Sequence, residues 1–469
     1  MKNNKIFILL PDGIGLRNFA YSDFQSIGNN NEFDVKFWNN TPFDLTSMGF
    51  NEIKIENAKN RPLTDIYKNV KIQAELNLNI KNSNDKVYNS YRFPLSYATL
   101  KKSIKSLLIQ TMTKFYSSEK GLEKLRQKMN NEERKTIFYE ESLATLQKEK
   151  PALIFCTNQR ITLAIAPLIA AKDLNIPTAT FIFSWDNLPK GTMIVQTDYY
   201  FVWSEHMKSE LLHYYSYIKK EQVFITGSPQ FEPHFDKNKL IAKEGFFAQN
   251  GLDATKKYIC YSGDDVTTSP DDAQYLEDVA QAIRTLNNKG NSLGIIFRRC
   301  PVDFSSRYDE VLEEYKDVIV SIAPKWERKG EMWNAILPTL EDVILQVNTI
   351  AHTEMVVNLG SSMVFDYAAF NKPCAFINYD VPNKKAVNWS VKTIYSYVHF
   401  RSMPTKKSVV WLNSKEEISS KIEMMLSDDA KEIVTNAQKW FEKINQQPAK
   451  DASKRMWNAI DEISKKQWN

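Results

Sequence analysis

Long apolar runs are missing from this chain of 469 residues. No stretch approaches the ~20 apolar residues that a helix needs to cross a bilayer, so the sequence predicts no membrane span. The opening segment MKNNKIFILLPDG has a basic start, but its apolar run is short and no small-residue cleavage site follows, which argues against a secretory signal. We therefore expect a cytoplasmic protein, with peripheral contact at the inner face of the membrane left open.

Cysteine is also scarce, and the charges nearly cancel. The four cysteines lie far apart, and three of them fall in apolar, strand-like runs, so we expect neither a disulfide nor a zinc site. The 61 basic and 56 acidic residues give a net charge of only +5, which argues against a nucleic-acid-binding protein. The short basic runs at 101–106 and 404–408 are interpreted as solvated surfaces, with a weak attraction to membranes as the open alternative.

What the chain does contain is an alternation of short apolar runs with helical patterns, which is typical of parallel sheets with crossover helices. A first series of predicted strands covers 5–10, 34–38, 152–156, 178–183, 199–203 and 222–226. A second series covers 258–262, 293–297, 318–322, 355–358, 374–378 and 409–412. Because 469 residues exceed what one core organises, the sequence predicts an α/β fold of two doubly wound parallel-sheet units in tandem, with a cleft.

The polar stretch 235–257 separates the two series of strands. We place an N-terminal domain at 1–245, with a helical insertion, or alternatively a helical lid, at about 96–150, and a C-terminal domain at 246–445. A terminal helix follows at 446–469. Ser427 is expected to cap the first of two helices in the segment 427–468.

The segment NLGSSMVFDYAAF joins the end of a predicted strand directly to a helix. Gly360 permits a tight turn, and Ser361 and Ser362 stand at the first helical turn, where free N–H groups attract an anion. Asp366 lies one turn further along the same face, where it could accept hydrogen bonds from ribose hydroxyls. A bound phosphate is one interpretation, and ordinary helix capping with a solvated Asp366 is the other.

Two more polar groups follow strands of the second series. Arg298 and Arg299 come directly after an apolar strand and could neutralise a pyrophosphate. Ser262 and Gly263 open a hydroxyl-rich loop after another strand. Each pattern alone is more often a surface ion pair or a turn, but all three segments are predicted to lie at the same edge of one sheet.

Trp326 and Trp333 fall in the loop PKWERKGEMWN, where neither has an obvious helical core face. Trp326 is a candidate to cover a nucleobase or a sugar. Packing in a core or against another domain is the commoner role of tryptophan.

The first strand leads into the loop of ILLPDGIGLRNF, which contains Asp12, Gly13 and Arg17. The third glycine of a dinucleotide-binding fingerprint is missing here. Asp12 is a candidate general base, although a turn residue is the commoner interpretation. We expect Asp12 and Arg17 to face the cleft between the domains.

A later strand ends in FIFSWDNLPKG, a polar and aromatic group suited to holding a sugar by stacking and hydrogen bonds. Its candidate residues are Trp185, Asp186, Asn187 and Lys190. The next strand leads into VWSEHMKSELL, an amphipathic helix with a serine cap.

Four segments together resemble a known family. SWDNLPKG (184–191), VWSEHMKSEL (202–211) and ITGSPQFEPHF (225–235), followed by GSSMVFDYAAFNKPCAFINYD (360–380), are similar to bacterial glycosyltransferases of the GT-B type. The similarity is ordered and spans most of 152–380. It is greatest to surface-polysaccharide transferases, which are themselves similar to CDP-glycerol glycerophosphotransferases.

The resemblance implies two Rossmann-like domains facing a cleft. The second domain would mainly hold a nucleotide-activated donor, and the first would mainly hold the acceptor. Ser361, Ser362 and Asp366 then match contacts to the donor diphosphate and ribose. The final helix, at 449–468, would cross back to pack on the first domain. Such enzymes commonly need no metal or other cofactor, and the only near-match to a D-x-D motif after a predicted strand is SGDDV at 262–266.

One departure from the family concerns Cys300, which stands in RRCP where related sequences often have a histidine before the proline. The charge-neutralising role of the family's histidine is therefore not assigned to this position. The catalytic base is left among Asp12, Asp186 and His206, in that order of preference, because each follows a predicted strand of the N-terminal domain.

The function expected from these features is transfer of a sugar from a nucleotide diphosphate sugar to a glycan or lipid-linked acceptor, in bacterial surface-polysaccharide synthesis. The open alternatives are a CDP-polyol phosphate transferase, a nucleotide-sugar 2-epimerase, and a catalytically silent nucleotide-binding subunit. A 2-epimerase would be expected to carry more acidic and histidine residues in the cleft, and this chain has only five histidines.

Overall fold

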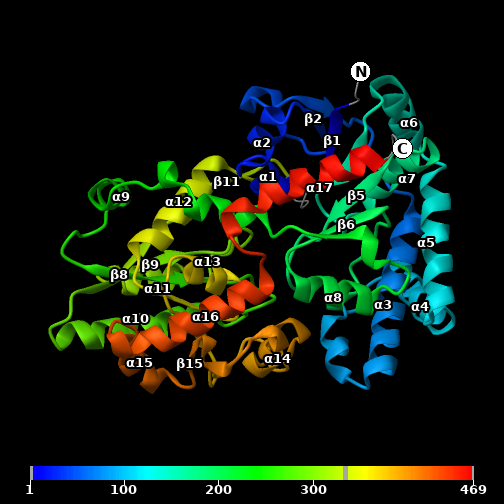
Figure 1. The fold of residues 1–469 in the computed structure, drawn as a ribbon. Helices are drawn as coiled ribbons and strands as arrows, with labels where there is room; N and C mark the ends of the chain where they lie inside the picture. The colour runs from blue at the N-terminus through cyan, green and yellow to red at the C-terminus, as the bar shows by residue number, and fades with distance from the viewer. Residues whose placement is uncertain (1–3, 331–335, 467–469) are drawn as a thin grey trace. The chain divides into compact units, whose positions relative to one another are not determined.

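The computed structural model describes residues 4–330 and 336–466 and divides into two compact units (Figure 1). The first unit comprises Met1–Gln230, Arg328–Leu337 and Ile444–Asn469, and the second comprises Phe231–Glu327 and Pro338–Lys443. The second unit begins before the predicted boundary at 245. The reason is local packing, because Phe231 contacts Phe441 edge to face and the Ile241 N–H donates to the Asn348 side chain.

The sheet of the first unit has seven parallel strands in the order β3-β2-β1-β4-β5-β6-β7. The strands are β1 (Lys5–Leu10), β2 (Asp34–Asn39), β3 (Glu52–Lys54), β4 (Leu153–Cys156), β5 (Thr178–Phe181), β6 (Tyr199–Val202) and β7 (Val223–Ile225). Strands β1 and β4 are apolar and buried on both faces, as central strands of a parallel sheet require. Strand β3 was not predicted, since its three residues include one apolar side chain.

The helices of the first unit include a block inserted between β3 and β4. They are α1 (Gly15–Phe19), α2 (Phe24–Asn30), α3 (Pro62–Ser83), α4 (Leu100–Tyr116), α5 (Glu119–Glu133), α6 (Ile137–Glu149), α7 (Ile165–Asp173), α8 (Glu205–Tyr214) and α17 (Ala452–Lys466). The inserted block starts with α3 at Pro62, well before the predicted start at 96. Helix α3 buries polar residues such as Lys71, Glu75 and Asn79, so its buried face does not appear as an apolar pattern.

Helix α17 packs on α2 within the first unit (Figure 1). The Trp457 ring stacks on Phe24 and Phe33, with ring centroids 4.8 and 5.0 Å away, and its indole N–H donates to the Phe24 carbonyl at 2.5 Å. Gly28 leaves room for this indole, because a Cβ there would lie 2.2 Å from the Trp457 ring. This contact attaches the C-terminal helix to the N-terminal part of the chain.

The sheet of the second unit has six parallel strands in the order β10-β9-β8-β13-β14-β15. The strands are β8 (Lys257–Ser262), β9 (Leu293–Arg298), β10 (Ile319–Ser321), β13 (Val356–Asn358), β14 (Cys374–Ile377) and β15 (Val410–Leu412). A separate two-stranded sheet pairs β11 (Trp326–Arg328) with β12 (Ile336–Pro338). The remaining helices are α9 (Lys243–Asn250), α10 (Asp272–Asn288), α11 (Asp309–Glu314), α12 (Leu340–His352), α13 (Met363–Ala369), α14 (Val391–Ser396), α15 (Ile418–Met425) and α16 (Lys431–Ile444).

The predicted α/β class with two parallel sheets is confirmed. Every predicted strand is present, with ends that differ by at most two residues. Ser427 accepts a hydrogen bond from the Asp429 N–H at the start of a short helical turn, as expected for a cap. In the described part of the chain, no helix is both long and apolar enough to cross a membrane.

Candidate functional site

Each sheet has one place where the order of its strands reverses. In the second unit the chain continues from β8 to β9 and β10 on one side, whereas β13, β14 and β15 lie on the other side. In the first unit the corresponding place lies between β1 and β4. Open α/β sheets bind ligands outside the carboxyl ends of the strands at such a switch point. The loops after β8 and β13, and those after β1 and β4, are therefore the first places to look for a site.

The turn after β13 contains Gly360, Ser361 and Ser362. Gly360 has φ +71°, a conformation that favours glycine, and a Cβ there would lie 3.1 Å from Ile394. The Ser361 N–H donates to the side chain of Asn358 at 2.9 Å, and the Ser361 hydroxyl accepts weakly from a backbone N–H at 3.3 Å. Ser361 thus supports the turn, while Ser362 is exposed. Helix α13, which follows, has only seven residues.

Arg298 is the last residue of strand β9, which lies beside β8 in the second sheet. Its side chain is buried and donates from Nη2 to both oxygens of Asp342, at 2.8 and 2.7 Å. Asp342 also accepts from the Trp326 indole N–H at 2.7 Å, so Trp326 is held by its polar edge. Arg298 is therefore already paired, although its buried Nη1 has no hydrogen-bond partner among the described residues.

Arg299 is half-buried and lies over the Tyr308 ring, with its guanidinium carbon 5.3 Å from the ring centroid. Such a stacked guanidinium keeps its N–H donors at the edge of the ring, where they can reach an anion. Trp326, proposed above as a stacking residue, is also half-buried. Trp333, the other tryptophan of that loop, lies outside the described residues.

The loop after β8 contains a buried acidic group. Ser262 ends the strand, and Gly263 follows in close packing, since a Cβ there would lie 3.0 Å from the Tyr308 hydroxyl. Burial, together with the charge of Asp272, raises the pKa of Asp264 well above its usual range. The buried Oδ2 atom of Asp264 has no hydrogen-bond partner within the described chain. Asp272 accepts from Tyr308 at 2.6 Å.

Asp366 is placed differently from the expectation. We expected its carboxylate to face ribose hydroxyls, but α13 turns that face inward, and Asp366 is only 4% exposed. Its Oδ1 atom lies 2.6 Å from Nε2 of His234, in the short helical turn Pro229–Phe235. His234 belongs to the ITGSPQFEPHF segment, 132 residues earlier in the chain. The pairing attaches the beginning of the second unit to the helix that follows the serine turn.

Asp12 lies at the switch point of the first unit, directly after β1. The side chain of Asn158, which follows β4, donates to its Oδ2 at 2.9 Å. Burial raises the pKa of Asp12 to about 6, while Asn158 and the backbone N–H groups of Gly15 and Ile14 act in the opposite direction. Asp12 therefore lies where a ligand of this sheet is expected, with a pKa suited to exchanging a proton near neutral pH.

The predicted sugar-holding segment joins the same edge of the sheet through Gln159. The Gln159 amide donates to the Asn187 side chain at 3.1 Å, and Asn187 donates to Asp186 at 2.9 Å. Lys190 forms an ion pair with Asp186. Trp185 is only 5% exposed, so little of its ring is available for stacking on a sugar.

The remaining candidate residues of the first unit are Gly13, Arg17 and His206. Gly13 is in close contact with the backbone, since a Cβ there would lie 2.5 Å from the Ile336 carbonyl oxygen. Arg17 is half-buried on α1. His206 lies in the first turn of α8, after β6, with Nε2 3.6 Å from a carboxylate oxygen of Glu210. The sheet order puts β6 three strands away from β1, so the structure does not bring His206 to Asp12.

Sequence reasoning missed Asn158 and Gln159, which stand in the tetrapeptide TNQR directly after β4. A run of polar residues at the end of an apolar strand was the available signal, and it is the same signal that identified the other segments. Within the described residues, no group of three or more His, Cys, Asp or Glu side chains is arranged to hold a metal ion.

Comparisons with known proteins were made with both the sequence and the structure. No family model matches the sequence, and neither does any curated protein. Solved structures with similar folds include a UDP-N-acetylglucosamine 2-epimerase (12% identity, TM-score 0.55, covering 98% of this chain and 96% of that one). Others are UDP-GlcNAc 2-epimerase from Methanocaldococcus jannaschii (13%, TM-score 0.51, 97% and 99%) and the co-structure of S. aureus MnaA with UDP (13%, TM-score 0.51, 97% and 96%). At these identities the likeness establishes the GT-B fold.

Proposed function

We propose that this protein is a glycosyltransferase that moves a sugar from a nucleotide diphosphate sugar to a glycan or lipid-linked acceptor in bacterial surface-polysaccharide synthesis. The observation that carries the proposal is the convergence of three polar segments at the switch point of the second sheet. They are the loop opened by Ser262 and Gly263, the arginines after β9, and the turn Gly360–Ser362. The GT-B fold supports a nucleotide-sugar substrate by analogy.

In this proposal the second unit binds the donor diphosphate. The stacked Arg299, the unpartnered Nη1 of Arg298 and the exposed hydroxyl of Ser362 supply donors for the negative charge that builds up on the leaving diphosphate. The donor sugar nucleotide is a substrate, and the proposed reaction uses no further cofactor. The charge of Arg298 is already balanced by Asp342, so Arg299 would carry most of the cationic contribution.

The first unit would act on the acceptor. Asp12, with its pKa raised to about 6, is ionised in most molecules at pH 7 and can remove the proton of an acceptor hydroxyl as the new glycosidic bond forms. Asp186, Asn187 and Lys190 would hold the hydroxyl groups of the acceptor, since their side chains already form one connected polar group.

A second candidate function is epimerisation of a nucleotide sugar at C2. It is favoured by the comparisons, because two of the structures named above are UDP-N-acetylglucosamine 2-epimerases. The two reactions differ in what happens to the bond between the sugar and the diphosphate. A transferase leaves that bond broken in its products, whereas an epimerase returns it intact.

The experiment that separates them is proton NMR of UDP-N-acetylglucosamine incubated with the purified protein, with and without magnesium. An epimerase yields a second nucleotide sugar inverted at C2 while total nucleotide sugar stays constant. A transferase consumes the nucleotide sugar and releases UDP, slowly to water and faster with an acceptor. Because the donor is unidentified, the same measurement is repeated with GDP-, CDP- and dTDP-linked sugars. The 2-epimer as sole product would overturn the transferase proposal.

A further inference from the structure

Exposed apolar side chains gather on one helix of the inserted block, α4. Leu100 and Phe115 are 80% and 79% exposed, and Ile104 and Leu107 are both more than half exposed. Leu108 is also exposed. We call these five residues the α4 stripe. Large apolar side chains scattered singly over a surface need no explanation, but a contiguous group on one element marks an interaction surface.

The α4 stripe lies on one face of the helix, away from the core. At 3.6 residues per turn, its five residues fall within an arc of about 100°. The residues that α4 buries, Ser106, Ile109 and Thr113, lie on the opposite side of the same helix. Folding of this chain therefore buries only one face of α4 and leaves the α4 stripe on the other face exposed.

Lysines flank the α4 stripe on both sides. Lys101 and Lys105 follow one edge and Lys114 lies at the other, whereas Lys102 projects from the opposite side of the helix. Lys105 forms an ion pair with Asp65 of α3, and α4 itself contains no acidic residue. An apolar face bordered by lysines matches an interface that is apolar inside and negatively charged at its surface.

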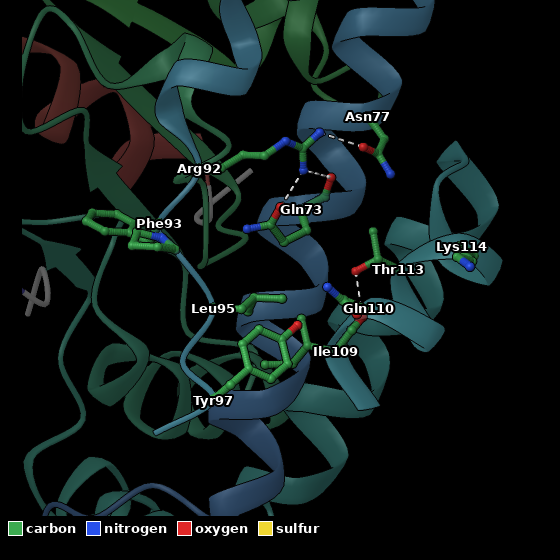
Figure 2. A pocket seen from close by; sticks show the side chains of 11 residues that line it. Gln73, Asn77, Arg92, Phe93, Leu95, Tyr97, Ile109, Gln110, Thr113 and Lys114 are labelled. Carbon is green, nitrogen blue, oxygen red and sulfur yellow. Dashed lines mark hydrogen bonds between the residues drawn. The ribbon is translucent and has the colours of Figure 1, made fainter. Parts of the chain in front are cut away.

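The segment that precedes α4 also leaves aromatic side chains exposed. A cavity of about 710 Å³ lies between this segment, α3 and α4, with Phe93, Tyr97 and Lys114 in its lining, but none of the five residues of the α4 stripe lines it (Figure 2). Phe93 is 78% exposed. The segment is held in place by Arg92, whose guanidinium donates to Asn77 at 2.6 Å and to Gln73 (Figure 2). Phe93 and Tyr97 therefore lie beside this cavity and are not part of the α4 stripe.

We propose that the α4 stripe and the lysines that border it form a docking surface for an anionic lipid bilayer, on which α4 lies in the plane of the interface. The apolar side chains would enter the boundary between headgroups and acyl chains, and the lysines would contact lipid phosphates. Charge complementarity selects this occupant. A second copy of the same stripe would bring lysines against lysines, and like charges destabilise such a contact.

The test is co-sedimentation of the full-length protein with vesicles of phosphatidylcholine alone or of phosphatidylcholine mixed with phosphatidylglycerol. We expect binding to the anionic vesicles, weakened at ~0.5 M salt because screening shortens the reach of the lysines. K101E/K114E should lower binding about thirtyfold, from ~1 kcal/mol for each lysine near an anionic surface. Leu100→Asp combined with Leu107→Asp should abolish it. All of these positions are exposed, and thermal melting of each variant verifies that it is folded.

The matched control is Val387→Asp in the second unit, at a residue that is also 80% exposed. It should bind vesicles as the wild type does. Absence of binding to anionic vesicles, or binding that the α4 variants leave unchanged, would overturn the proposal. So would a concentration-dependent dimer that the Leu100 and Leu107 substitutions dissolve, because it would assign the stripe to self-association.

Discussion

Asp12 shows what folding does to a single carboxyl group. Its pKa rises from 3.8 to about 6 because burial disfavours the charged form more than the hydrogen bond from Asn158 and the nearby backbone N–H groups favour it. A carboxyl group whose folded pKa lies above its unfolded pKa stabilises the fold fully below about pH 4. That contribution is lost as the pH rises through 6. At neutral pH the charge is kept at a cost in stability, which is typical of a functional residue.

Asp12→Asn should therefore stabilise the protein at pH 7 by up to about 3 kcal/mol, the value of a two-unit shift in pKa, because the amide cannot ionise. The gain should shrink to less than ~1 kcal/mol near pH 4, where the wild-type carboxyl group is protonated in the folded state and about half protonated in the unfolded state. Urea unfolding of the two proteins at pH 7 and at pH 4 measures both values. An equal difference at the two pH values would show that the pKa of Asp12 is not raised by folding.

The limits of sequence reasoning are clearest for single residues. Asp12 could be singled out because it follows a strand, but its hydrogen-bond donor Asn158 comes 146 residues later. Asp366 was expected to face solvent, because helical spacing says which residues share a face and not whether that face is covered. Its partner His234 comes from a distant segment that no local pattern connects to α13.

Elements were more predictable than residues. Central parallel strands are buried on both faces, so they appear as continuous apolar runs, and both series of strands were found on that basis. The short strands β3, β11 and β12 were missed, because three residues give too little pattern. Helix α3 was missed because part of its buried face is polar, with Lys71 and Glu75 forming a buried ion pair.

The contact between α17 and α2 leads to a prediction at this scale. Trp457→Ala should lower the free energy of unfolding by about 3–5 kcal/mol, because the fully buried indole fills the space beside Gly28 and stacks on two aromatic rings. Trp457→Phe, the matched control, keeps an aromatic ring and loses the hydrogen bond to Phe24, so its effect should be smaller. Urea unfolding of the three proteins measures this order. Equal stability of all three would contradict the contact.

At the scale of the whole molecule, the chain folds around two large parallel sheets, each with its own switch point. The alternation of strands and helices predicted this architecture, and solved structures at 10–13% identity share it. The fold does not determine the substrate. Donor and acceptor selectivity depend on loop side chains brought together from distant segments, and the spacing of residues in the sequence does not encode that arrangement.

We propose that the switch point of the second sheet binds a nucleoside diphosphate. Isothermal titration calorimetry of the full-length protein with UDP, GDP, CDP, dTDP and CMP tests it most directly, with and without magnesium. We predict that one diphosphate binds selectively and that Arg299→Ala combined with Ser362→Ala weakens it at least tenfold, by ~1.4 kcal/mol or more. Lys190→Ala in the first unit should leave the affinity unchanged. Absence of heat at millimolar ligand, or equal affinity for the double variant, would contradict the claim.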